Sequence, residues 1–105
     1  MNMRKAIAYI SLLGMLVVAG DAYAGKGEVL YRSKACNTCH GPDGNTPLQA
    51  AYPKIGGQSA EYLVQQIKDI RDGKRNNGYS RVMAPLVKNL KDDEIVDIST
   101  WLSGK

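Results

Sequence analysis

Cys36-Asn37-Thr38-Cys39-His40 is the stretch of sequence that decides the fold of this 105-residue chain. A Cys-x-x-Cys-His run is typical of covalent haem attachment, because two thiols on one tight turn can form thioethers with both vinyl groups of one haem. The imidazole that follows can then bind the iron as an axial ligand. The chain has two cysteines and one histidine, and this motif uses them all. The sequence therefore predicts one covalently bound haem c, attached through Cys36 and Cys39, with His40 on the iron.

Other uses of paired cysteines fit this sequence less well. A structural zinc site needs four nitrogen or sulfur ligands, and the chain has no second pair of Cys or His. A thioredoxin-like redox pair is expected within a βαβ pattern, which is missing here. A structural disulfide between Cys36 and Cys39 is the simplest alternative, but it would leave His40 without a role.

Residues 1–24 have the pattern of a secretory signal peptide. Arg4 and Lys5 form a positive start, an uncharged run follows from Ala6 to Gly20, and Ala22-Tyr23-Ala24 is a cleavage pattern. The uncharged run is shorter than the ~18 residues expected of a membrane span, which makes a retained anchor the less favoured alternative. We therefore expect cleavage after Ala24 and a periplasmic mature chain, Gly25–Lys105.

The predicted mature chain is long enough for one domain, with a monohaem site in residues 25–105. A domain this small has a limited apolar core, and a buried haem can supply the missing apolar mass. Its 12 basic and nine acidic side chains give a net charge of +3, without a dense cluster of Lys or Arg. The charge pattern therefore gives no indication of nucleic-acid binding.

Three segments of the mature chain have helical patterns, and the chain has no convincing strand. Gly25–Ser33 is expected to be a short first helix, with Gly27 and Tyr31 on one face. A glycine in a helix costs about 1 kcal/mol relative to alanine, so Gly27 indicates a close helix crossing. Ser59–Asp72 and Asp92–Leu102 have apolar residues at helical spacing, and Trp101 is expected in the core against the first helix.

The segment between the haem motif and the second predicted helix is expected to be loop. Turn residues are frequent from Gly41 to Ala51, and residues 52–58 have no regular periodicity. The neighbouring Gly56 and Gly57 suggest backbone running close to something flat and bulky, although a simple flexible loop would explain them almost as well.

Met83 is the candidate for the second axial ligand. A methionine sulfur is a soft donor suited to haem iron, and His/Met ligation raises the reduction potential. Met1, Met3 and Met15 leave with the signal peptide, so Met83 is the only methionine of the predicted mature chain. It is expected in an irregular stretch before Pro85. The alternative is that Met83 is ordinary core filling.

The mature sequence resembles a class I cytochrome c, and most closely a single haem domain of the cytochrome c4 type. Beyond the haem motif, the matching stretches are Asp43-Gly44-Asn45, Tyr52–Ser59, Tyr62-Leu63, Gln66-Ile67, Asp72–Arg75 and Leu90–Leu102. The resemblance implies a small all-α class I cytochrome c fold, with three to four short helices wrapped around one covalent haem. It also implies that the terminal helices cross, and that the Pro53 carbonyl accepts a hydrogen bond from the axial histidine. Cytochrome c4 carries two such domains, whereas this sequence carries one.

The predicted function is that of an exported monohaem carrier of single electrons. With His40 and Met83 both on the iron, no position is open for a substrate, so we expect neither an enzyme nor a small-molecule substrate. The expected partners are redox proteins that dock transiently, with membrane association only if the signal is uncleaved. One alternative is a haem subunit of a periplasmic dehydrogenase complex. A peroxidase or ligand sensor would require Met83 to be off the iron.

Overall fold

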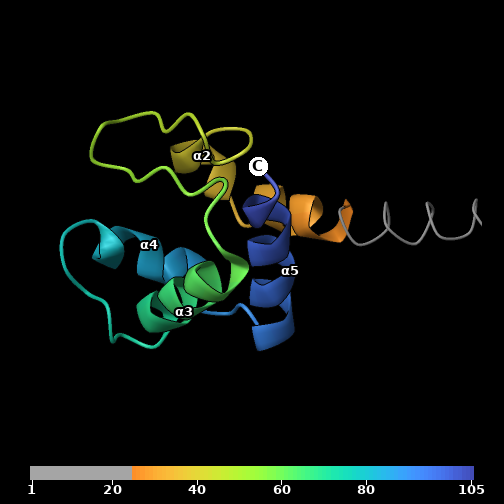
Figure 1. The fold of residues 1–105 in the computed structure, drawn as a ribbon. Coiled ribbons are helices and arrows are strands. Elements are labelled where there is room, and N and C mark those ends of the chain that lie inside the picture. The colour runs from red at the N-terminus through yellow and green to blue at the C-terminus, as the bar shows by residue number, and fades with distance from the viewer. Residues whose placement is uncertain (1–24) are drawn as a thin grey trace, which may run out of the picture.

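The computed structural model describes residues 25–105, in which all regular secondary structure is helical (Figure 1). Residues 25–33 are helical, and α2 (Cys36–His40), α3 (Ala60–Arg71), α4 (Ser80–Val87) and α5 (Asp92–Ser103) follow. The all-α class is thereby confirmed. The predicted signal peptide and its cleavage site lie outside the described residues. None of the helices in residues 25–105 combines the length and apolar character needed to cross a membrane.

The helix over residues 25–33 crosses α5 at Gly27, as the sequence suggests. A Cβ added to Gly27 would lie 2.6 Å from the Cβ of Trp101 and closer still to the carbonyl oxygen of Asp97. Only a residue without a side chain allows the two backbones to approach so closely. One turn further, Tyr31 packs on Trp101 with ring centroids 4.9 Å apart and planes tilted by 45°. The predicted core position of Trp101 is confirmed.

Helix α3 is shorter by one residue at each end than the predicted Ser59–Asp72, because these two residues are its caps. The Ser59 hydroxyl accepts a hydrogen bond from the Tyr62 amide at 3.2 Å, which satisfies one of the free amides of the first turn. Gly73 takes the left-handed conformation, with φ of 79°, just beyond the C-cap residue Asp72. The apolar stripe of α3, made of Leu63, Ile67 and Ile70, is buried.

The start of α5 is fixed both locally and by α3. Lys91 is the N-cap residue, and its backbone amide donates to the Glu94 side chain at 3.0 Å. Arg71, the last residue of α3, donates from Nη1 to the Leu90 carbonyl at 3.0 Å and to the Asp92 carboxylate at 2.7 Å. The C-terminal end of α3 is therefore tied to the N-terminal end of α5.

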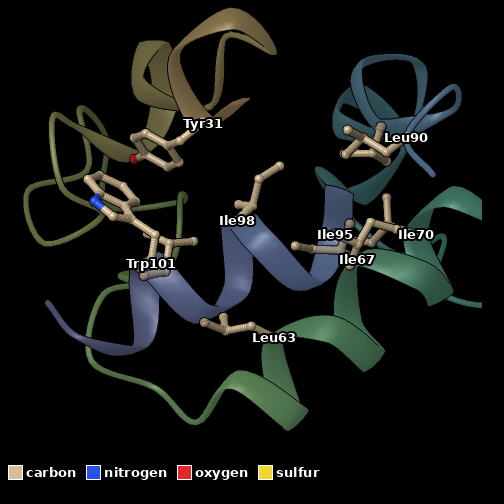
Figure 2. Close-up of a cluster of buried hydrophobic side chains, with 10 residues drawn as sticks. Tyr31, Leu63, Ile67, Ile70, Leu90, Ile95, Ile98 and Trp101 are labelled. Atoms are coloured by element: carbon tan, nitrogen blue, oxygen red, sulfur yellow. The ribbon is translucent and has the colours of Figure 1, made fainter. Parts of the chain in front are cut away.

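The buried apolar side chains form one cluster around α5 (Figure 2). Ile95, Ile98, Trp101 and Leu102 project from α5 itself. The rest come from the first helix, α3, α4 and the segment before α5: Tyr31, Leu63, Ile67, Ile70, Val87 and Leu90. A single core thus joins the two ends of the described chain to the helices between them.

Two segments that were not predicted as helices are helical. The haem motif, expected as a tight turn, is the short helix α2, and the stretch around Met83, expected to be irregular, is the helix α4. Pro85 lies inside α4, where it removes one backbone hydrogen bond. The helix persists because Ser80 and Val87 are buried and Met83 and Ala84 pack against the core. Tertiary packing here outweighs a poor local sequence.

The loop over residues 41–58 folds back on itself, which explains one of its paired glycines. The amides of Ile55 and Gly56 both donate to the Gly44 carbonyl, at 2.9 and 3.0 Å. A Cβ on Gly56 would lie 2.8 Å from Cγ of Asn45 and 2.9 Å from the Asp43 carbonyl oxygen. Gly56 is therefore needed because the loop packs closely on itself at this point. This reason differs from both explanations considered for the two glycines, close approach to a flat, bulky group and simple flexibility.

Replacing Gly27 by alanine should destabilise the protein. The new methyl group would overlap α5, and overpacking of this kind costs roughly 1–3 kcal/mol. Gly25→Ala is the matched control, because a Cβ at Gly25 meets no atom within 4 Å. The free energies of unfolding of the haem-loaded variants can be compared by denaturant titration. A Gly27→Ala variant at least as stable as Gly25→Ala would contradict the close crossing.

Candidate haem site

Helix α2 brings the two cysteines and the histidine of the motif to one cavity. Cys36 and Cys39 are three residues apart on the helix, so their side chains lie on the same face. Both line the cavity together with His40, and the structure has no disulfide between them. Burial raises the pKa of the Cys36 thiol to about 11. The helix ends at Gly41, whose φ of 84° turns the chain sharply away.

His40 is oriented by a hydrogen bond to the loop that follows α2. Its side chain is buried, and Nδ1 lies 3.0 Å from the carbonyl oxygen of Pro53. Since a carbonyl can only accept, Nδ1 carries the proton and donates it. Burial lowers the pKa of His40, an effect that the Pro53 carbonyl opposes. The neutral ring therefore keeps the lone pair of Nε2, the form in which imidazole binds a metal.

Tyr31 ties the haem motif to the crossing of the terminal helices. Its hydroxyl donates to the carbonyl of Gly41, the residue after His40, at 2.6 Å. The side chain is fully buried. Burial is the main cause that raises the pKa of Tyr31 to about 12, and the nearby Cys36 adds to it. On the other side of the motif, the Leu48 amide donates to the Cys39 carbonyl at 3.1 Å. The position of α2 is thus fixed from two directions.

The cavity has the size and chemistry of a haem pocket. Its volume is about 330 Å³, within the range of cofactor sites, and its walls are mainly apolar. Residues of α2 and of the loop over residues 41–58 line the cavity together with residues of α3 and α4, and Figure 1 shows α2 and that loop above α3 and α4. Two thiols, one neutral imidazole and one thioether line this single space, a donor set that fits haem c. Residues 25–105 contain no cluster of His, Cys, Asp and Glu suited to another metal.

Met83 lines the cavity from α4, across the fold from the helix that carries His40. It is partly buried against the core, and its helix is positioned by Ser80 and Val87. Pro53 also lines the cavity. The structure therefore brings together all five residues singled out in the sequence as candidate haem contacts: Cys36, Cys39, His40, Pro53 and Met83.

Several residues at the cavity could not be assigned a place there from the sequence. Tyr52 and Tyr79 meet edge to face with ring centroids 5.7 Å apart, and both line the cavity. Gln66 and Arg75 also line it, and Arg75 donates to the Gln66 side chain at 3.0 Å. Tyr52, Gln66 and Arg75 fall within stretches that resemble the cytochrome c4 domain, and Tyr79 falls in none of them. Nothing in their own spacing indicates a common site.

An all-α domain whose Cys-x-x-Cys-His helix opens onto one apolar cavity has the architecture of a class I c-type cytochrome. The cytochrome c family model matches residues 24–104. The chain belongs to the cytochrome c family. As a member of this family, it carries one covalently bound haem c and is an electron carrier rather than an enzyme.

Relatives within the family include single-domain and longer proteins. Cytochrome c-554(548) of Halomonas halodenitrificans is 41% identical over 83% of this chain and 99% of its own length. Cytochrome c4 of Pseudomonas aeruginosa is 38% identical over 91% of this chain, but only 44% of its own length is matched. The crystal structure of cytochrome c4 from Pseudomonas stutzeri superposes with a TM-score of 0.70 at 34% identity, over 80% of this chain and 48% of that chain. The chain thus spans less than half of the cytochrome c4 proteins, and resembles one of their haem domains.

Replacing Tyr31 by phenylalanine should reduce stability and weaken its dependence on alkaline pH. Losing the hydroxyl leaves the buried Gly41 carbonyl unpaired, which costs about 1–3 kcal/mol at neutral pH. Because folding raises the pKa of Tyr31 from 10.0 to about 12, its stabilisation is complete below pH 10 and is lost as pH rises toward 12. The variant should therefore lose less stability than the wild type between pH 9.5 and about 11.

Tyr62→Phe is the control for this experiment, since Tyr62 is about half exposed on α3. Denaturant titrations at pH 7 and over the alkaline range should give Tyr62→Phe a curve close to that of the wild type. If Tyr31→Phe also follows the wild-type curve, the hydroxyl contributes nothing and the proposed tether is wrong.

Proposed function

We propose that this chain is an exported carrier that moves single electrons between redox proteins through one haem, bound by Cys36, Cys39, His40 and Met83. The observation that carries the proposal is the convergence of the haem motif and Met83 on one apolar cavity. Haem iron supplies the redox chemistry, because it can accept one electron and release it again. The work of the polypeptide is to hold this group and to adjust its potential.

In the proposed site, α2 supplies the covalent attachment. Cys36 and Cys39 would each hold the haem through a thioether, the product of adding the thiol S–H across one vinyl group. The three-residue spacing on one helix face supports attachment of both sulfurs to the same haem. The covalent link fixes the haem next to His40, which is already oriented by the Pro53 carbonyl.

His40 and Met83 are the proposed axial ligands. The neutral His40 ring can offer Nε2 without losing its hydrogen bond to Pro53. The thioether of Met83 is a weaker and softer donor, which favours the reduced iron and raises the potential. Since both axial positions would be filled, a small molecule has no open coordination site, as suits a carrier.

Electrons would pass at the open side of the cavity, where partners can approach. Tyr79, Val82 and Leu86 line the cavity and are about half exposed or more. The exposed Arg81 lies between Tyr79 and Val82 in the chain, so charged and apolar side chains are mixed on this segment. A mixed surface supports brief docking with an interface under ~1,200 Å². It favours a diffusing carrier over a permanent haem subunit of a dehydrogenase complex, the second candidate.

Export to the periplasm is part of the proposal and can be tested by the mass of the protein. Cleavage after Ala24 and attachment of one haem should give the mass of residues 25–105 plus one haem group. The intact mass should be measured under denaturing conditions on protein from the periplasmic fraction. Protein that retains residues 1–24 in the membrane fraction would indicate an anchored carrier. A mass without haem would disprove covalent attachment.

Replacing Met83 by alanine should lower the reduction potential. Water or a stronger donor such as a lysine amine would take the place of the sulfur and favour the ferric form. The ferric variant should also bind cyanide faster than the wild type, and the protein should lose about 2–5 kcal/mol of stability because a partly buried side chain is removed. The potential can be measured by voltammetry and cyanide binding by absorption spectroscopy.

Leu86→Ala is the matched control, because it removes a similar apolar volume from the same helix and the same cavity. It should leave cyanide binding slow. Equal potentials and equally fast cyanide binding in wild type and Met83→Ala would mean that Met83 only fills the core, and the carrier mechanism would need another sixth ligand.

A further inference from the structure

The loop that orients His40 and the segment that carries Met83 are not joined by hydrogen bonds. Within residues 25–105, the loop over residues 41–58 bonds to itself, to the first helix, to α2 and to the C-terminal end of the chain. Residues 76–90 bond among themselves and, through the Leu90 carbonyl, to Arg71. Contact between these two segments therefore depends on the packing of side chains.

One aromatic pair connects the two segments directly. Tyr52 of the loop and Tyr79 at the start of α4 lie with ring centroids 5.7 Å apart and planes at 85°. This edge-to-face arrangement is one that aromatic rings prefer, because the positive edge of one ring meets the negative face of the other. Both side chains line the cavity, Tyr52 partly buried and Tyr79 about half exposed. The pair thus joins the two segments where the cavity meets the surface.

Tyr52 belongs to the side of the cavity that orients the histidine. It directly precedes Pro53, whose carbonyl oxygen lies 3.0 Å from Nδ1 of His40. Proline restricts the backbone of the residue before it, and the Tyr52 amide also donates to the Gln49 carbonyl at 3.0 Å. The Tyr52 ring therefore projects from backbone that is already fixed next to the proposed histidine ligand.

Tyr79 belongs to the methionine side and is the N-cap residue of α4. Its carbonyl accepts hydrogen bonds from the amides of Val82 and Met83, at 3.0 and 3.2 Å. Tyr79 and Met83 are four residues apart, and both line the cavity. The start of α4 has no side-chain cap and no acidic residue in its first turn. A helix with so little local stabilisation at its start depends on whatever holds its cap residue in place.

We infer that the Tyr52–Tyr79 pair holds the start of α4 against the loop that orients His40, and thereby keeps Met83 at the iron. For its effect on the iron, this inference rests on the axial ligands proposed above. A helix that opens locally would take the Met83 sulfur off the iron. One edge-to-face pair changes an equilibrium constant by a factor of roughly 2 to 12. Loss of the pair should raise the population of the open form by this factor.

The first test is the rate at which cyanide binds to the ferric, haem-loaded protein, because cyanide can bind only after the sulfur has left. Tyr52→Leu and Tyr79→Leu should each increase this rate roughly 2- to 12-fold. Tyr52→Phe and Tyr79→Phe should stay close to the wild type, since the contact needs the rings and not the hydroxyls. Tyr62→Leu is the matched control: Tyr62 is 51% exposed against 54% for Tyr79, but it does not line the cavity.

Two further measurements separate this contact from a general loss of stability. The double variant Tyr52→Leu/Tyr79→Leu should bind cyanide no faster than either single variant, because both substitutions remove the same contact. In Tyr52→Leu, hydrogen exchange of the Met83 amide should be faster by the same factor, while the Ile67 and Ile70 amides of α3 keep their rates. Additive effects in the double variant, equal acceleration in both helices, or phenylalanine variants as fast as the leucine variants would each overturn the inference.

Met83→Ala in the same cyanide assay keeps this test independent of the proposed function. A wild type that binds cyanide as fast as Met83→Ala would refute the proposed sixth ligand, and with it the effect of the pair on the iron. A slow wild type with equally slow leucine variants would refute only the role of the pair. If Tyr52→Leu is too unstable to purify, Tyr79→Leu still decides the question, because it removes the same contact at a half-exposed side chain.

Discussion

The arrangement of the whole domain depends on the two contacts of Tyr31. Its ring packs on Trp101, where the first described helix crosses α5, and its hydroxyl donates to the carbonyl next to His40. A buried hydroxyl needs a hydrogen-bond partner, and the Gly41 carbonyl provides it. The crossing itself is possible only because Gly27 has no side chain. The packing of the two chain ends therefore fixes where the haem motif lies.

The apolar core and the cavity wall are largely the same set of side chains. Eight of the ten buried core residues also line the cavity; the exceptions are Ile95 and Trp101. A domain of this size buries a smaller fraction of its surface than a larger one and gains little net stability from its polypeptide core alone. A bound haem that packs against these residues would extend the core, so cofactor binding and folding stability are linked in this fold.

Much of the fold could be predicted from the sequence where local signals and packing agree. Ser59, the apolar spacing of α3 and the left-handed Gly73 all indicate the same helix, and the structure follows them. Helix α4 was missed because Pro85 is a strong local signal against a helix, and the packing of Val87 that outweighs it is not visible in the sequence.

Some residues of the candidate site could likewise be predicted from the sequence, and others could not. Cys36, Cys39 and His40 are neighbours in the chain, so a motif identifies them. Gln66 and Arg75 come together only when the segment after α3 folds back against that helix. A hydrogen bond across nine positions outside any regular pattern has no signature in one sequence. The haem motif can therefore be recognised in the sequence, whereas the hydrogen-bonded pair of Gln66 and Arg75 at the cavity becomes visible only in the fold.

The two sides of the cavity are stabilised by different kinds of interaction. On the histidine side, the orientation of the His40 ring is set by a helix of five residues, a hydrogen bond to Pro53 and the tether from Tyr31. On the methionine side, Met83 lies in a helix weakened by Pro85 and held mainly by packing. Packing contacts are lost together when a segment opens locally, whereas a covalent thioether is not. If Met83 is the sixth ligand, the weaker iron bond is on the less securely held side, so local opening should free the methionine before it affects the attachment to α2.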